Sequence, residues 1–146
     1  MDIAKISKIL NRDYPLLLLD GVTNVKSKKS CKAFKNLTYN EWFFPKHFPE
    51  RPLMPGSLQI EAFTQAIALP LLLETFEQNS SPVPILLAGV DKVRFNDAVI
   101  PGQRFDILAN IDRIAMGVAS ATAIGSVKGK TVSECKITYK LIEGEE

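Results

Sequence analysis

The stretch that decides the fold runs from residue 47 to residue 65 and reads HFPERPLMPGSLQIEAFTQ. It begins with His47, the only histidine of the chain, and its first half carries prolines at positions 49, 52 and 55. Each proline fixes its own φ and pushes the preceding residue towards extended geometry, so this half predicts a loop that holds its shape. From Gly56 onward the pattern changes to that of a helix.

Apolar side chains recur at three- and four-residue spacing after Gly56, and no further Gly or Pro interrupts them before Pro70. The positions between them, as far as Leu73, are also mostly apolar, so the sequence predicts a helix that is buried all round. Glu61 lies on this helix. Because a carboxylate among apolar side chains is costly to ionise, we expect Glu61 to keep its proton and to serve as an acid.

Length and composition limit the class of protein. A chain of 146 residues with 46% hydrophobic content is enough for one domain with a substantial core, and we expect a single domain over residues 1–146. The net charge of +2 and the 23% of charged residues exclude a protein that coats nucleic acid. The N-terminus has no basic leader with an apolar core, and the longest apolar runs, 16–19 and 71–73, are too short to span a bilayer. We therefore predict a cytoplasmic protein with no membrane span.

The two cysteines, Cys31 and Cys135, lie far apart in the sequence and have no ligand-like spacing. One histidine cannot build a usual zinc site. The sequence therefore predicts two reduced thiols in the core, no metal ion and no cofactor.

The remaining pattern predicts a short helix over residues 3–10, opened by Asp2, and six strands. The predicted strands cover residues 16–26, 31–37, 84–95, 104–114, 118–127 and 131–142. Turn signals at Pro101-Gly102, Met116-Gly117 and Lys128-Gly129 are of the kind that links antiparallel neighbours. One buried helix among such strands predicts an α+β fold in which an antiparallel sheet curls around the helix.

Residues 47–65 also resemble the active-site segment of the 3-hydroxyacyl-acyl carrier protein dehydratases. The family pattern is His-Phe-Pro-x-x-Pro-x-x-Pro-Gly-x-x-x-x-Glu-Ala-x-x-Gln, and this chain meets each fixed position. Residues 13–20, 91–95 and 99–102 match the family as well, so the resemblance spans most of the chain. It implies the hotdog fold, an antiparallel sheet wrapped around a long central helix. It also implies dehydration of (3R)-3-hydroxyacyl thioesters to trans-2-enoyl thioesters in fatty-acid or specialised lipid or polyketide-type biosynthesis.

By this resemblance His47 is the catalytic base, Glu61 the catalytic carboxylate, and Gly56 the residue whose backbone N–H holds the thioester carbonyl. An imidazole exchanges protons near neutral pH, and a glycine at a helix start offers an unsatisfied N–H with no side chain in the way. Gln65, one helical turn beyond Glu61, is expected to orient its carboxylate. Ser57 stands where a small apolar residue is usual, and we expect it to add a donor near the carbonyl.

The resemblance also implies partners. The substrate is an acyl thioester, carried by acyl carrier protein, although the residues leave coenzyme A open as the carrier. His and Glu of the family face each other across a homodimer interface with the acyl chain between the protomers, and such dimers also assemble into hexamers as trimers of dimers. Family members commonly have basic residues after Phe95, whereas this chain has Asn96-Asp97. Lysines 26, 28, 29 and 32 are an alternative docking surface.

Two other functions stay open from the sequence. A hotdog acyl thioesterase would use the helix carboxylate to activate water and would depend less on His47. A noncatalytic acyl-binding subunit would keep the polar pair as structure, with Lys46, Glu50 or Asn96-Asp97 spoiling the site or its access.

Overall fold

The computed structural model describes residues 1–79, 81 and 83–142, so that residues 80, 82 and 143–146 of the predicted single domain lie outside the described residues. The elements in chain order are α1 (Ile3–Leu10), β1 (Gly21–Lys26), β2 (Ser30–Asn36), α2 (Gly56–Asn79), β3 (Ile85–Phe95), β4 (Arg104–Ala115), β5 (Val118–Val127) and β6 (Lys130–Leu141). The helix predicted over residues 3–10 is confirmed, with the Asp2 side chain accepting a hydrogen bond from the Lys5 N–H at its start.

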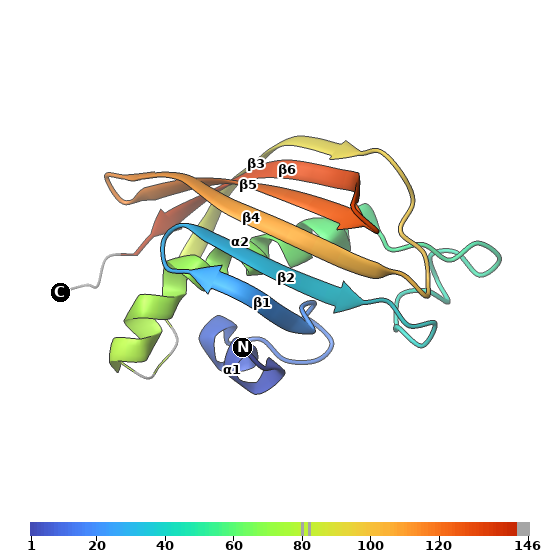
Figure 1. Cartoon of the computed structure of the whole chain (residues 1–146), viewed down its shortest axis with the longest axis horizontal. Helices are drawn as coiled ribbons and strands as arrows, with labels where there is room; N and C mark the ends of the chain where they lie inside the picture. Colours follow the sequence, from blue (N-terminus) through green and yellow to red (C-terminus); the bar gives the residue numbers. More distant parts are fainter. Residues whose placement is uncertain (80, 82, 143–146) are drawn as a thin grey trace.

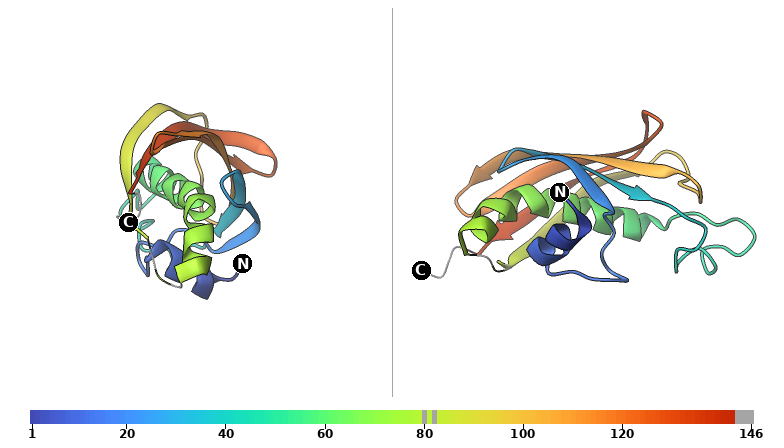
Figure 2. Two further views of the ribbon diagram at one scale, coloured as in Figure 1. Left: turned by 90° about the vertical axis from the view of Figure 1, so that its left-hand side faces the viewer. Right: turned by 60° about the horizontal axis from the view of Figure 1, so that its bottom comes forward.

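The six strands form one antiparallel sheet in the order β1-β2-β4-β5-β6-β3. The sheet curves around α2, and α1 packs beside α2 on the side away from the sheet (Figures 1 and 2). Alternate residues of the central strands point at α2, as in β5, where Ala119, Ala121 and Ala123 are buried. The predicted α+β architecture, an antiparallel sheet wrapped around a long central helix, is therefore confirmed.

The position of β3 differs from the prediction. The turn at Pro101-Gly102 does not join antiparallel neighbours, because β3 pairs with β6 and not with β4. Instead the Gly102 N–H donates to the Leu37 carbonyl oxygen, and the Leu37 N–H donates to that of Gln103. This turn thus fixes the chain to the segment after β2, and β3 is carried to the far edge of the sheet (Figure 1).

The predicted strand over residues 16–26 is also too long at its start, because β1 begins only at Gly21. Part of the preceding backbone is bound by a side chain of α2. The Leu18 N–H donates to Gln65 Oε1 at 2.9 Å, and Gln65 Nε2 donates to the Leu16 carbonyl oxygen at 2.7 Å. These backbone groups are satisfied by an amide side chain instead of a strand partner. Of the apolar run 16–19, Leu18 and Leu19 are buried, whereas the side chain of Leu16 is exposed.

The long helix is covered on all sides from Ala62 to Leu72, as predicted. By length and composition alone, α2 could span a membrane. Two-thirds of its most apolar 18-residue stretch is buried inside the molecule, so α2 is the core helix of a folded domain. The helix continues through Pro70, and its later turns run at an angle to the first ones beside α1 (Figure 1). A proline has no N–H for the carbonyl one turn earlier, which accounts for the change of direction.

Candidate active site

The loop that carries His47 is held by buried aromatic side chains and by backbone hydrogen bonds. Phe43 and Phe44 are buried in the core just before it. At its far end, the Met54 N–H donates to the carbonyl oxygen of Val99 at 2.7 Å. The shape of the loop is therefore held by tertiary contacts as well as by its prolines.

His47 itself is partly exposed and stacks on Phe48, with ring centroids 4.3 Å apart. Its Nδ1 lies 3.3 Å from the Leu53 carbonyl oxygen, and the Leu53 N–H donates back to the His47 carbonyl oxygen at 2.8 Å. A carbonyl oxygen only accepts, so this hydrogen bond requires the proton on Nδ1. The lone pair of the neutral imidazole then lies on Nε2, the nitrogen that can take up a proton from another molecule.

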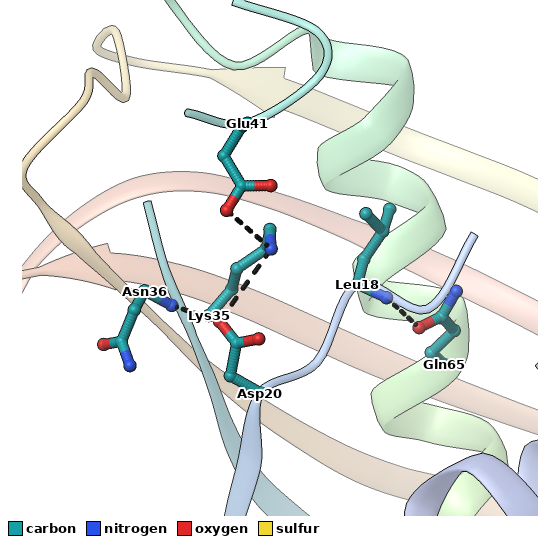
Figure 3. Close-up of polar contacts among 6 residues, drawn as sticks. All are labelled: Leu18, Asp20, Lys35, Asn36, Glu41 and Gln65. Carbon is teal, nitrogen blue, oxygen red and sulfur yellow. Dashed lines mark hydrogen bonds and ion pairs between the residues drawn. The ribbon is translucent and has the colours of Figure 1, made fainter. Parts of the chain in front are cut away.

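A buried lysine anchors the start of the same loop. Lys35 of β2 is only 4% exposed, and its Nζ lies 3.2 Å from Glu41 Oε2 and 3.8 Å from Asp20 Oδ2 (Figure 3). The backbone N–H of Asn36 donates to the same Asp20 oxygen at 2.7 Å. An ammonium so far from water needs both carboxylates, so this network ties the loop at Glu41 to β2 and to the entry of β1.

Substitution of Glu41 and substitution of Lys35 are expected to lower the free energy of unfolding by different amounts. Glu41→Gln leaves a buried ammonium with one distant carboxylate, and we expect it to lower the free energy of unfolding by about 3 kcal/mol. Lys35→Met removes the buried charge itself and is expected to cost less. The measurement is urea-induced unfolding, with Glu77→Gln as the matched control because the Lys5–Glu77 pair is largely exposed. Equal losses for Glu41→Gln and Glu77→Gln would contradict the assignment.

Gly56 begins α2 directly after Pro55, with Gln59 Nε2 donating to the Met54 carbonyl oxygen at 3.1 Å beneath it. A Cβ built on Gly56 would lie 2.6 Å from Cζ of Phe95, so the ring of Phe95 rests on the glycine backbone. The Phe95 side chain is itself 49% exposed. Only glycine lets the helix start and the end of β3 approach this closely.

Glu61 lies five residues further along α2, about 7.5 Å from Gly56 along the helix axis at 1.5 Å per residue. It is partly exposed, and its Oε2 accepts a hydrogen bond from Gln65 Nε2 at 3.0 Å. The predicted contact between Gln65 and Glu61 is thus present. Gln65 is fixed in turn by the backbone of Leu16 and of Leu18, and Figure 3 shows the hydrogen bond with Leu18. The side chain of Glu61 is less enclosed than the sequence predicted, because it is partly exposed. The other oxygen, Oε1, accepts no hydrogen bond from the described residues.

Glu61 lines two pockets. The first, of about 390 Å³, is called the Tyr139 pocket here and lies between α1, α2, the start of β3 and β6. Its lining residues are Ile9, Leu10, Asn11, Arg12, Glu61, Thr64, Gln65, Ala68, Leu72, Val83, Pro84, Ile85, Leu87 and Tyr139. The second, the Ser57 pocket, is lined by Ser57, Leu58, Glu61 and residues 11–16. The carboxylate therefore lies where the two pockets meet.

The structure does not bring all predicted site residues together within one chain. Glu61, Gln65 and Ser57 line these pockets, whereas His47 lines neither of them. The basic turn of lysines 26, 28, 29 and 32 is also remote, since the Lys28 N–H donates to the Pro70 carbonyl oxygen, fourteen residues along α2 from Gly56. Lys28 is further paired with Glu74 at 3.2 Å. This turn is therefore poorly placed to receive a carrier of the substrate.

The two cysteines are buried and free, as predicted. Burial raises the pKa of Cys31 to about 12 and that of Cys135 to about 11, so neither is a thiolate at neutral pH. Among residues 1–79, 81 and 83–142, no group of three or more His, Cys, Asp or Glu side chains is placed to hold a metal ion.

Several residues of the site region were not found from the sequence. Lys35 and Tyr139 carry no motif and read as ordinary strand positions, and Phe95 was noted only as part of a matching segment. Their roles arise from contacts between elements far apart in the chain: the Tyr139 hydroxyl donates to the Thr64 carbonyl oxygen at 2.9 Å, across 75 residues. A signal that could have been used is the alternation of strand residues, which places Lys35 and Tyr139 relative to the core.

Comparison with known proteins assigns this geometry to a family. Residues 10–136 match the model of the FabA-like domain. The chain is 39% identical over 143 residues to the 3-hydroxyacyl-[acyl-carrier-protein] dehydratase FabZ of Clostridium beijerinckii, covering 97% of this chain and 99% of the relative. It is also 39% identical over 136 residues to the FabZ dehydratase of Burkholderia thailandensis, covering 93% of this chain and 85% of the relative.

Solved structures agree on the fold. The dehydratase heterocomplex ApeI:P of Xenorhabdus doucetiae superposes with a TM-score of 0.80 at 21% identity, covering 97% of this chain and 93% of that one. An uncharacterized protein of Pyrococcus horikoshii gives a TM-score of 0.71 at 15% identity, covering 93% of this chain and 92% of that one. The fold is the hotdog fold, as the family resemblance of residues 47–65 implied.

Proposed function

We propose, from the premise that this chain belongs to the family of FabA-like domains, that it dehydrates (3R)-3-hydroxyacyl thioesters carried by acyl carrier protein to trans-2-enoyl thioesters in fatty-acid biosynthesis. The observation that carries the proposal is the orientation of the two candidate catalytic groups. His47 has a free Nε2 because its Nδ1 is bound, and Glu61 has a free Oε1 because Gln65 holds its other oxygen. We take the chain to form one domain and the enzyme to be cytoplasmic.

The reaction divides among three groups. Neutral His47 Nε2 takes the α-proton, and the negative charge that develops on the thioester oxygen meets the backbone N–H of Gly56 and the positive end of α2. Glu61 Oε1 gives its proton to the departing hydroxyl, which leaves as water while the double bond forms. The proton held by His47 then passes to solvent and Glu61 is reprotonated, which restores the enzyme. Gln65 fixes the position of Glu61, and Ser57 is a further donor near the carbonyl.

The complete site needs a second copy of the chain. In one chain His47 lines neither pocket of Glu61. Among the described residues β3 has a strand partner on one side only, and it exposes apolar side chains along its length: Leu86, Leu87, Val90, Val93 and Phe95. An exposed apolar edge strand is suited to pairing with another chain. We infer a two-fold homodimer through β3, with His47 of one protomer facing Glu61 of the other.

The Tyr139 pocket is suited to the acyl chain. Glu61 stands at its polar end, and most of the other lining side chains are apolar. The thioester end then lies among Glu61, Gly56 and the partner's imidazole, where the chemistry takes place. An apolar pocket with a few convergent polar groups at one end is the usual form of a small-molecule site.

The first test is hydration of a trans-2-enoyl thioester by the purified protein, which is the reverse reaction, on both acyl carrier protein and coenzyme A. The dehydratase proposal expects formation of the (3R)-3-hydroxyacyl thioester without release of thiol. Release of free thiol would instead show a thioesterase, in which water in the Ser57 pocket is activated by Glu61. Binding of the thioester with no conversion of either kind would show a noncatalytic acyl-binding subunit.

Gly56→Ala is expected to separate activity from stability. The added methyl displaces the Phe95 ring, which can turn outward because it is half exposed, so we expect a loss of less than about 1 kcal/mol in the free energy of unfolding. The carbonyl site is altered at the same time, and kcat/KM is expected to fall by about 10²-fold. Both quantities are measured on one preparation. Because alanine keeps the backbone N–H, unchanged kcat/KM would contradict the need for a helix start without a side chain at the carbonyl site, and not the N–H donor itself.

A further inference from the structure

Among the described residues that line the Tyr139 pocket, Tyr139 is the only aromatic one. It comes from β6, points at α2 and is 7% exposed, and its hydroxyl donates to the Thr64 carbonyl oxygen at 2.9 Å. Its neighbours across the sheet are Ala119 on β5 and Leu87 on β3. The ring therefore crosses the layer between the sheet and the helix, held at both ends.

The phenol is unsuited to proton transfer. Burial raises the pKa of Tyr139 to about 12, with the nearby Glu61 adding to the increase, so the phenol stays neutral at physiological pH. Its proton is already given to a helix carbonyl. The contribution of Tyr139 is thus its shape, that of a fixed wall.

The size of the pocket sets a limit on what it can hold. Along α2 it extends from Glu61 to Leu72, eleven residues, or about 16 Å at 1.5 Å per residue. Its volume of about 390 Å³ is that of about a dozen water-sized groups, at ~30 Å³ for each water in the liquid. Ile9 and Leu10 of α1 close the side opposite the sheet. A straight chain of medium length fits this space.

We propose that Tyr139 limits the acyl group to chains of medium length by closing the sheet side of this pocket. The inference rests on the proposed function, because it takes the occupant to be the substrate's acyl chain. The space behind the ring is bordered by the short side chain of Ala119, so removing the ring opens room for a longer chain. On the opposite wall, Ala68 of α2 is short, and a larger side chain there would fill the pocket.

The test uses trans-2-enoyl thioesters of short, medium and long acyl chain and compares their kcat/KM for hydration. Tyr139→Val, which keeps a residue suited to a strand, is expected to raise the long-to-short ratio of kcat/KM by about tenfold. Ala68→Leu is expected to lower the same ratio by about tenfold. Thr138→Val is the matched control, because it is the adjacent residue of β6 on the opposite face of the sheet. A purely structural role of Tyr139 would lower all rates together and leave the ratio unchanged.

The outcomes distinguish this inference from the proposed function. If the wild type is active but neither pocket variant changes the ratio by more than about twofold, the inference is wrong and the dehydratase proposal stands. If the wild type converts no thioester of any length, the dehydratase proposal fails. The pocket is then tested by the dissociation constants of unreactive acyl thioether analogues of the same three lengths. An identical length dependence in wild type and Tyr139→Val would overturn the inference there too.

Discussion

Glu61→Gln is expected to lose nearly all hydration of enoyl thioesters, by about 10²- to 10⁴-fold in kcat/KM, while the protein folds as before. The amide has the shape of the carboxyl group and can still accept the hydrogen bond from Gln65 Nε2, so residues 16–18 and the helix keep their contacts. What the variant lacks is a proton that Oε1 can deliver to the leaving hydroxyl. The measurement is hydration of the enoyl thioester, with far-UV circular dichroism and urea unfolding as checks on the fold.

Glu74→Gln is the matched control for this variant. Glu74 lies on the same helix, but its side chain is half exposed and pairs with Lys28 near the basic turn. We expect its activity to equal that of the wild type. If Glu61→Gln kept activity within about tenfold of Glu74→Gln, the carboxylate would not be the acid and the proposed mechanism would fail.

The second large effect is recovery of activity in mixed dimers. His47→Ala and Glu61→Gln homodimers are each expected to be inactive. In a dimer that contains one copy of each, one of the two sites has an intact His47 and an intact Glu61, because these residues come from different protomers. Mixed dimers purified through two different affinity tags are therefore expected to show about half of the wild-type activity.

This recovery tests the interface directly. A site contained within one chain would leave both sites of the mixed dimer defective, so activity at the level of the two homodimers would disprove the shared site. Dimers of His47→Ala with two different tags are the control and are expected to stay inactive. A charged residue placed on the exposed edge of β3, as in Val90→Glu, provides an independent check, since it should yield monomers that are folded but inactive.

Much of the fold followed from local pattern. The short helix after Asp2 and the strands from β4 to β6 lie within one residue of the predicted bounds, and the long helix begins at Gly56 as predicted but continues past Leu73 to Asn79. Periodicity of apolar residues and turn residues such as Lys128-Gly129 act over a few positions, so a sequence displays them directly. The candidate site residues were also read from one segment, because His47, Gly56, Glu61 and Gln65 lie within nineteen positions.

The predictions that were wrong concern features set by contacts between residues far apart in the chain. The sequence pattern predicted a strand from residue 16, but Gln65 binds Leu16 and Leu18 from 49 and 47 residues away. It placed β3 beside β4, but closing the sheet around α2 carries β3 to the edge next to β6. Hydrogen bonds between distant residues leave no period in the sequence, so neither outcome could be seen there.

Residue type and periodicity are local properties, so the amino-acid sequence was enough to show which residues are available for chemistry and which element carries them. The tertiary structure alone decided the environment of those residues. It bound one oxygen of Glu61 to Gln65, fixed the proton of His47 on Nδ1 through Leu53, and buried Lys35 between Asp20 and Glu41. It also set the ring of Tyr139 against Thr64. Each of these contacts joins residues whose distance in space is set by packing of the sheet on α2, and packing depends on the whole chain.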